Sequence, residues 1–90
     1  MQAWIERLAE TLGEEPLSET ETTRLLAASR DVAHRVERKT TPLAAFLVGS
    51  TVGRGLAHGA DRSGVLEAVL ADLERLLPPA SAEGSSSAKG

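Results

Sequence analysis

The sequence contains no cysteine, which excludes disulfides, thiolate catalysis, iron–sulfur ligation and thiolate zinc sites. Aromatic residues are also scarce: Trp4 and Phe46 are the only two, and tyrosine is absent, so the core is expected to be aliphatic. The longest stretch without a charge, residues 40–53, is too short to span a bilayer. No basic segment followed by an apolar run opens the chain, so we expect no secretory leader and a cytoplasmic location.

What remains is ordinary for a soluble globular protein. The chain has 90 residues, enough for one small domain, of which 41% are hydrophobic and 26% charged. The net charge of −3 is unevenly spread. Residues 1–23 carry six acids against one arginine, whereas residues 24–39 carry five bases against two acids. This asymmetry predicts a charged face on a folded domain.

Apolar periodicity predicts helices over residues 2–12, 19–38, 42–56 and 63–77. Gly13 is suited to the left-handed position after the first helix, and "SETE" from Ser18 fits a capping box. Thr41 can cap the third helix. No segment alternates with period two, so the fold class is all-α, a compact four-helix domain over residues 1–79 with antiparallel helices and short connections. Residues 80–90, rich in serine and glycine, are expected to be disordered.

The third helix carries no charge from Pro42 to Gly53 and is apolar nearly all round, which predicts that it is the buried centre of the domain. Its second half, "VGSTVGRGLAHG", raises the question of a phosphate loop. The spacing of a Walker loop is not met: Arg54 stands in place of the lysine, and no strand precedes it. The dinucleotide-binding pattern fails as well.

Small residues recur in this stretch at intervals of four, on one face of a helix. They are Ala45, Gly49, Gly53 and Ala57. Two mid-helix glycines cost helix propensity, so a packing reason is expected, namely the close approach of another helix at this face. The alternative is a helix that breaks near residues 53–55.

Arg30, His34 and Arg38, spaced by four, predict a basic stripe on the exposed side of the second helix. The plainest interpretation is a solvated face with neighbouring charges such as Asp31 and Arg35. The functional interpretation is a surface that binds an anion or a partner. Catalysis is not supported, because no nucleophile or metal-ligand spacing accompanies His34, and no metal site or cofactor is expected.

An anion site is predicted where Arg35, Arg38 and Lys39 meet the start of the third helix at Thr40 and Thr41. Nucleic acid is not expected as the ligand, given a pI of about 5.3 and only two aromatic residues. The carboxylates of Glu14, Glu15, Glu19 and Glu21 are interpreted as solubility and capping charges.

The segment "RDVAHRVERKTTPLAAFLVGSTVGRG", residues 30–55, together with "WIERLAETLG" before it, resembles a small actinobacterial domain of unknown function. That domain occurs alone or at the C-terminus of molybdenum-cofactor guanylyltransferase-like proteins, and the resemblance covers residues 4–77. The residues that carry it include Trp4, Ile5, Asp31, Val32, Ala33, His34, Val36, Arg38, Pro42, Leu43, Phe46, Leu47, Gly49, Gly53 and Arg54. The resemblance implies an association with molybdopterin nucleotide metabolism, and no catalytic residue is carried over.

Two functional hypotheses follow. The first is a non-enzymatic accessory or protein-interaction module, docking through Arg30, His34 and Arg38 onto an enzyme of molybdenum-cofactor biosynthesis. The second is a binder of a phosphorylated or pterin-nucleotide compound near Arg35, Arg38 and Thr41. The chain itself is expected to be a monomer or a weak homodimer.

Overall fold

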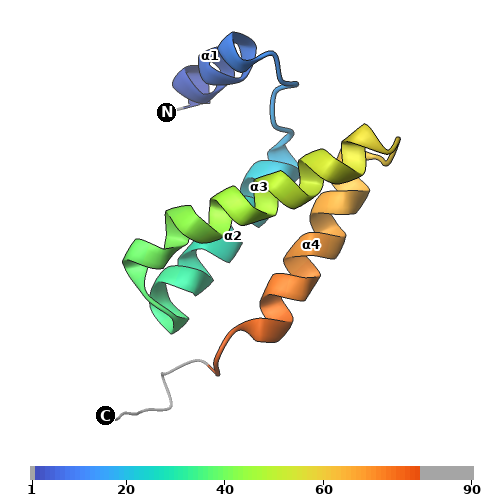
Figure 1. Ribbon diagram of the computed structural model, residues 1–90. Helices are drawn as coiled ribbons and strands as arrows, with labels where there is room; N and C mark the ends of the chain where they lie inside the picture. The colour runs from blue at the N-terminus through green and yellow to red at the C-terminus, as the bar shows by residue number, and fades with distance from the viewer. Residues whose placement is uncertain (1, 80–90) are drawn as a thin grey trace.

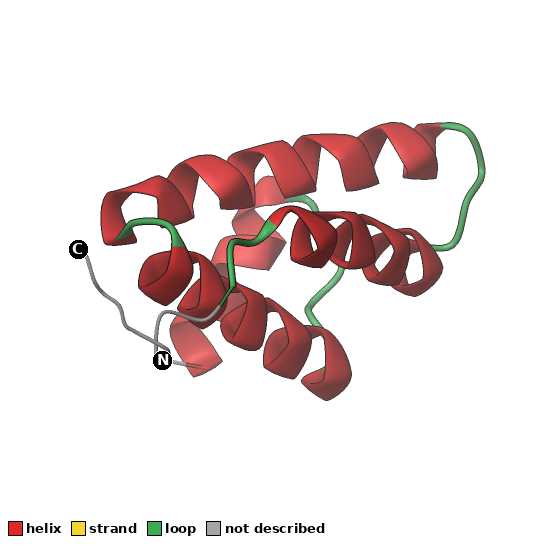
Figure 2. Ribbon diagram, turned by 90° about the horizontal axis from the view of Figure 1, so that it is seen from below, coloured by secondary structure: helices red, strands yellow, loops and turns green. Residues whose placement is uncertain are grey.

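The computed structural model describes residues 2–79, most of which are helical (Figure 1). The α-helices are α1 (Gln2–Leu12), α2 (Glu19–Arg35), α3 (Thr41–Ala57) and α4 (Arg62–Leu76), and a short 3₁₀ helix, η1 (Arg38–Thr40), precedes α3. Figure 2 shows helices joined by short loops, and residues 2–79 contain no strand. The all-α class with four helices is therefore confirmed. The expected tail, 80–90, lies outside the described residues.

Local signals set the ends of the helices. Ser18 and Glu21 form the complete capping box at the start of α2, and Asp61 caps α4 by accepting from the Gly64 N–H at 2.8 Å. Gly13 follows α1 with φ +74°, and Gly59 follows α3 with φ +88°, the left-handed backbone that glycine adopts without strain. Each of these ends is thus closed by groups within a few residues of it.

The buried core comes from α2, α3 and α4. Its members are Ala28, Val32, Val48, Val52, Leu66 and Leu70. Leu70 of α4 is the most buried large side chain, at 1% exposure. Side chains from the edges of the same three helices pack around this cluster: Leu25, Leu56, Val65, Val69 and Leu73. The core is aliphatic, as its composition predicts.

Helix α1 contributes nothing to this core and packs against no other helix to a comparable extent among the described residues (Figure 1). Trp4, Leu8 and Leu12, at intervals of four on one face of α1, are all exposed. The amphipathic pattern therefore formed a helix, but its apolar face lies uncovered in the single chain.

Helix α2 ends at Arg35, three residues before the expected end at Arg38. Val36 leaves helical geometry and Glu37 is extended, with φ −169° and ψ 139°. These residues and η1 turn the chain back so that α3 can cover α2. Arg38 therefore lies on η1 and does not continue a stripe with Arg30 and His34, which corrects the expectation of one continuous basic face.

The close packing expected at the small-residue stripe is absent. Ala45, Gly49, Gly53 and Ala57 are all exposed, and a Cβ placed on Gly49 or Gly53 would meet nothing within 4 Å. Val48 and Val52, on the neighbouring arc of α3, pack against α2 and α4. The four small residues therefore lie beside this helix contact and take no part in it. The prediction was wrong for these positions, and the alternative of a helix break is wrong too, because α3 continues to Ala57.

The glycine that permits close approach is Gly55. A Cβ on Gly55 would lie 3.0 Å from a methyl carbon of Val65 in α4. Gly55 follows Val48 and Val52 at helical spacing on the buried side of α3. Close contact between α3 and α4 is thus made one arc away from the predicted stripe.

Helix α3 is central, as predicted, but only one side of it is buried. Leu43, Phe46 and Leu47 face outwards and are mostly exposed. A helix that is apolar all round is normally covered on every side. Here α2 and α4 cover one side, and no described element covers the other, which corrects the prediction of a fully buried helix.

Candidate interaction surfaces

The basic residues singled out from the sequence do not form one site. Arg30 and His34 lie exposed on the outer side of α2, opposite the arc that carries Ala28 and Val32. Arg38 is exposed on η1, and Arg35 is half-buried at the end of α2. None of these four residues forms an ion pair within residues 2–79.

The predicted anion site at the start of α3 is not assembled. The N–H groups of Thr40 and Thr41 donate to the carbonyls of Glu37 and Arg38, and Pro42 has no N–H. Thr40 makes no side-chain cap. The Thr41 hydroxyl is buried without a hydrogen-bond partner and lines an apolar core cavity of about 30 Å³. Thr41 therefore turns away from any anion near Arg38, which corrects its assignment as a cap and as a ligand.

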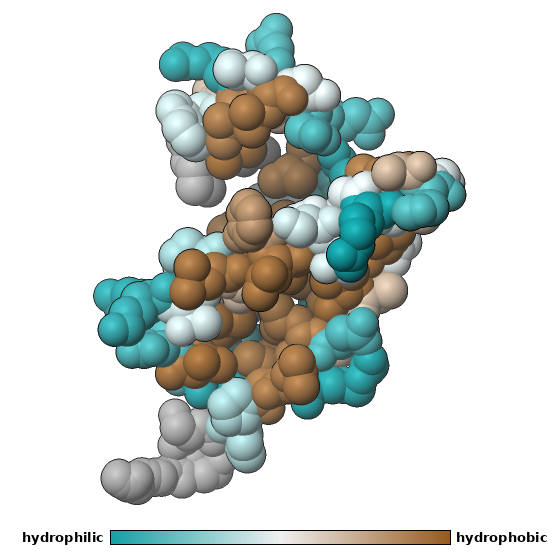
Figure 3. Space-filling view, in the orientation of Figure 1, coloured by the Kyte–Doolittle hydropathy of each residue, from teal (hydrophilic) through white to brown (hydrophobic). Residues whose placement is uncertain are grey.

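A larger apolar groove lies between the C-terminal half of α2, η1, α3 and the end of α4, with a volume of about 360 Å³. Val36, Ala44, Leu47, Val69, Leu73 and Leu76 are among the residues that line it. We call it the Leu47 groove. Leu47 is 65% exposed and Leu76 is 86% exposed along it. Figure 3 shows the hydrophobic surface over α3 and α4 on this face.

Charged residues border the Leu47 groove at one end. Thr40 of η1 lines it, and the preceding Arg38 and Lys39 are exposed. Lys39 reaches the Glu37 carboxylate at 3.7 Å on the surface, a contact with little energetic weight. The charged residue in the lining itself is Asp72 of α4, which pairs with Arg75, so the groove is mainly apolar with one paired acid in its wall.

A second apolar groove lies on the other side of α3, with a volume of about 710 Å³. Its lining includes Gly49, Val52 and Gly53 of α3, Leu25 of α2, and Leu17 of the connector that follows α1. We call it the Gly49 groove. Val48 reaches both grooves, so they share part of their floor.

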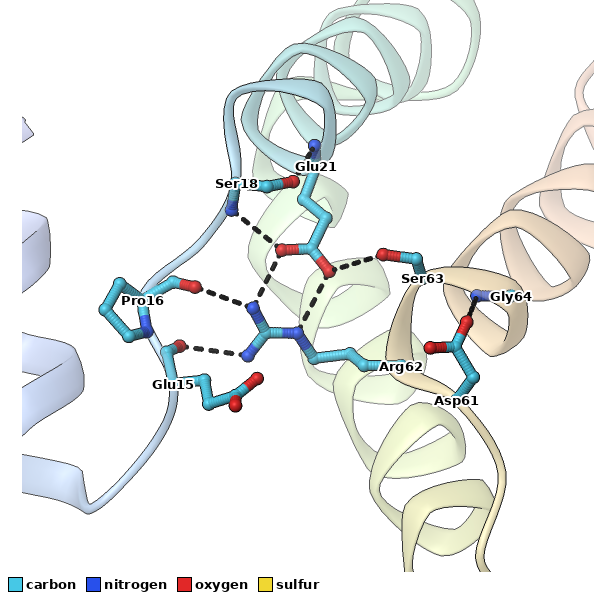
Figure 4. A network of polar contacts seen from close by, with 8 residues as sticks. All are labelled: Glu15, Pro16, Ser18, Glu21, Asp61, Arg62, Ser63 and Gly64. Atoms are coloured by element: carbon cyan, nitrogen blue, oxygen red, sulfur yellow. Dashed lines mark hydrogen bonds and ion pairs between the residues drawn. The ribbon is translucent and has the colours of Figure 1, made fainter.

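A buried ion pair holds the connector, α2 and α4 together (Figure 4). Glu21 is 4% exposed, and both of its carboxylate oxygens accept from the Arg62 guanidinium, at 2.8 and 3.0 Å. The same guanidinium donates to the carbonyls of Glu15 and Pro16 at 2.9 and 2.7 Å. This cluster, which we call the Arg62 clamp, leaves neither charged group unpaired.

The hydrogen bonds of Glu21 explain why its carboxylate stays ionised. Its carboxylate also accepts from the Ser18 N–H and the Ser63 hydroxyl. Hydrogen bonds from Arg62 and then from Ser18 lower the pKa of Glu21 to about 2, against an opposing effect of burial. The pKa of Arg62 is raised, chiefly by its hydrogen bonds to Glu21. The clamp is a satisfied structural pair, with no free group to perform chemistry.

Two more exposed ion pairs support the same contact between α2 and α4. Arg24 lies 3.1 Å from Glu67 and 3.3 Å from Glu74. Its hydrogen bonds, first to Glu67 and then to Glu74, raise its pKa.

Comparison with known families gives one match. The sequence matches a family described as "Domain of unknown function (DUF6457)" over residues 1–85. The chain belongs to this family. The resemblance to a small domain of unknown function is confirmed at that level. No curated protein and no solved structure matches the chain.

Within residues 2–79 no three histidine, aspartate or glutamate side chains gather closely enough to hold a metal ion. In the same residues no helix has both the length and the apolar character needed to cross a membrane.

Sequence reasoning missed the Arg62 clamp of this DUF6457 domain. Glu21 was interpreted as a capping and solubility charge, which is half of its role. One signal was present: Glu21 lies on the same arc of α2 as Leu25, Ala28 and Val32, the side that enters the core. Nothing in the sequence indicated that Arg62, 41 residues away, would meet it.

Proposed function

We propose that this DUF6457 domain is a non-enzymatic protein-interaction module whose binding surface is the Leu47 groove. One observation carries the proposal: Leu47 and Leu76 lie mostly exposed along an apolar groove of about 360 Å³. Large contiguous apolar patches on small proteins mark interaction sites, because their exposure to water is otherwise unfavourable.

The groove favours an amphipathic helix with acidic residues at one end. Helices bind such grooves by placing apolar side chains from successive turns into them. Arg38 and Lys39 are exposed and directly precede Thr40 of the groove lining, so acidic groups on a partner near Thr40 would be attracted to them. Arg30 and His34 lie on the outer side of α2 and are left out of this surface.

The sequence resemblance suggests a class of partner. We propose an enzyme of molybdenum-cofactor biosynthesis, with the present chain as its accessory module in the cytoplasm of an actinobacterium. The resemblance supports this choice of partner; the groove geometry supports protein binding in general.

The alternative, a phosphorylated or pterin-nucleotide ligand at the start of α3, has no observation in its favour. The N–H groups of Thr40 and Thr41 are already engaged, and the Thr41 hydroxyl faces the core. The proposed function is therefore protein binding alone.

Affinity capture with matched variants tests the proposal. The variant Leu47→Gln/Leu76→Gln removes the apolar walls of the groove, and Leu43→Gln is the control, since Leu43 is equally exposed on α3 but does not line the groove. A partner should be captured by the wild type and by Leu43→Gln and lost with the double variant. Arg38→Glu should weaken the binding of the same partner.

The partner class is tested separately by titrating a purified molybdenum-cofactor guanylyltransferase with the wild type and the double variant in a calorimeter. Heat of binding with the wild type alone would support both parts of the proposal. Recovery of the same proteins by the wild type and Leu47→Gln/Leu76→Gln would contradict the groove as a binding surface.

A further inference from the structure

Two apolar surfaces of this chain, apart from the Leu47 groove, have no partner within the described residues. One is the face of α1 that carries Trp4, Leu8 and Leu12, with Trp4 58% exposed. The other is the Gly49 groove, of about 710 Å³. Figure 3 shows hydrophobic side chains of α1 on the same face of the molecule as the hydrophobic surface of α3, and separate from it.

The two surfaces match in shape. Trp4, Leu8 and Leu12 form a ridge of large side chains with a four-residue period. The wall of the groove on α3 has the same period but is built of small residues, and beyond Gly49 and Gly53 lies open space. A four-residue ridge that packs into a four-residue groove is the commonest geometry of helix contact in globular proteins.

The Arg62 clamp fixes the connector that follows α1 beside the Gly49 groove, which Glu14 and Leu17 also line. Arg62 binds the carbonyls of Glu15 and Pro16, only three and four residues after the end of α1. Between them, the Gly13 and Glu14 N–H groups close the helix by donating to Glu10 and Ala9. With these bonds in place, the face of α1 that carries Trp4, Leu8 and Leu12 is exposed and lies outside the lining of the groove, so a second molecule can reach both surfaces.

We propose that the chain forms a reciprocal homodimer in which α1 of each copy lies in the Gly49 groove of the other. The exchange covers both unpartnered surfaces on both copies, and such a two-fold arrangement closes without leaving a site open for further association. Charge supports the same pairing: α1 carries Glu6 and Glu10 against Arg7, and Arg54, next to Gly53 on α3, forms no ion pair within residues 2–79. The lining itself adds one acid, Glu14, and one base, Arg62.

Trp4 provides a direct probe, because it is the sole tryptophan and lies on the helix that would be buried. The wild-type chain should sediment with twice its 9.5 kDa mass at high concentration. Over the same concentration range the Trp4 emission should shift to the blue, and both signals should reverse together on dilution.

The variant Gly49→Gln/Gly53→Gln tests the groove. Both positions are exposed with room for a side chain, so the variant should keep the helicity of the wild type, while the added side chains block α1. The dimer dissociation constant should rise by at least about tenfold. Thr23→Gln, on the outer side of α2, should leave it unchanged, and Trp4→Gln should also weaken the dimer.

Three results would overturn the proposal. One is a monomer at every concentration with Trp4 emission of a solvent-exposed indole. Another is a monomer with blue-shifted emission, which would mean that α1 closes on its own groove. The third is a dimer that persists in both Gly49→Gln/Gly53→Gln and Trp4→Gln. None of these outcomes bears on binding at the Leu47 groove, which has its own variants.

Discussion

The two sides of α3 have similar side chains and different surroundings. On the inner side Val48 and Val52 are 9% and 8% exposed, in contact with α2 and α4. On the outer side Leu43 and Phe46 are 64% and 73% exposed. Both sides would be read as core from their hydrophobicity alone.

The difference shows that coverage by neighbouring helices, and not composition, decided which side of α3 became core. The inner side is secured by apolar packing and by the polar pairs that join α2 to α4. The outer side has no such cover within residues 2–79, and of its large side chains Leu47 lines the Leu47 groove whereas Leu43 and Phe46 do not. Substitutions on the inner side should therefore lower stability far more than substitutions on the outer side.

The largest expected effect is that of Leu70→Ala, which empties the most buried position opposite the inner side of α3. Loss of this side chain should lower the free energy of unfolding by about 3 kcal/mol, from lost burial and the cavity left behind. Urea denaturation followed by circular dichroism measures the change. Leu43→Ala, the matched exposed leucine, should cost less than about 0.5 kcal/mol. Equal losses would remove the distinction between the two sides.

The next effect concerns Glu21. Its pKa is lowered from 4.5 to about 2 in the folded chain, so its contribution is complete above pH 4.5 and is lost as the pH falls towards 2. The free energy of unfolding should fall by up to about 3 kcal/mol across this window. Urea denaturation at a series of pH values measures it.

Glu21→Gln isolates that contribution. The variant should be less stable at pH 7, because Arg62 loses its charged partner, and it should lose most of the pH dependence between pH 4.5 and 2. Glu67→Gln, which removes one exposed partner of Arg24, should cost much less stability than Glu21→Gln and should keep the pH dependence. A wild-type profile unchanged by Glu21→Gln would show that Glu21 is not the group responsible.

A smaller effect, of opposite sign, is expected at Gly49. Its surroundings are open, so Gly49→Ala should raise the free energy of unfolding by about 0.5–1 kcal/mol through helix propensity. Thermal unfolding at a concentration where the chain is monomeric measures the gain. Gly55→Ala is the contrasting variant, because its methyl group would press on Val65 at 3.0 Å, and it should gain less or lose stability. A larger gain in stability for Gly55→Ala than for Gly49→Ala would contradict the close helix contact at Gly55.

The smallest expected effect is that of Phe46→Gln, on the outer side. Since Phe46 is mostly exposed, the substitution should change the free energy of unfolding of the monomer by less than about 0.5 kcal/mol. Denaturation at a concentration where the chain is monomeric measures it. A loss comparable to that of Leu70→Ala would show that this side of α3 is covered after all.

Much of the fold could be predicted from the sequence, and much less of the candidate sites. The capping box at Ser18 and the left-handed Gly13 were predictable because each depends on residues within one turn. The placement of Arg38 was not, because it depends on where α2 must stop for α3 to fold back. The inward-facing Thr41 hydroxyl is a similar case, set by the way the start of α3 packs onto α2 and α4.

The glycine-rich stretch, residues 48–59, shows both what the sequence could predict and what it could not. Its spacing correctly excluded a phosphate loop, because the motif itself is local and is missing. Its role in packing could not be assigned from period alone, because a helix has many arcs with a four-residue repeat. Gly55 is the glycine of the close contact because Val65 of α4 lies against it, and this could be known only from the position of α4.

The sequence by itself determined that the chain forms helices, where most of them start and stop, and that it lacks the residues for thiolate chemistry. These properties follow from capping, periodicity and composition, which act over a few neighbouring residues. The tertiary structure alone decided that Glu21 meets Arg62, that one side of α3 is core and the other surface, and that α1 stands apart. The reason is physical: burial is conferred by segments distant along the chain, and hydrophobicity alone does not identify those segments.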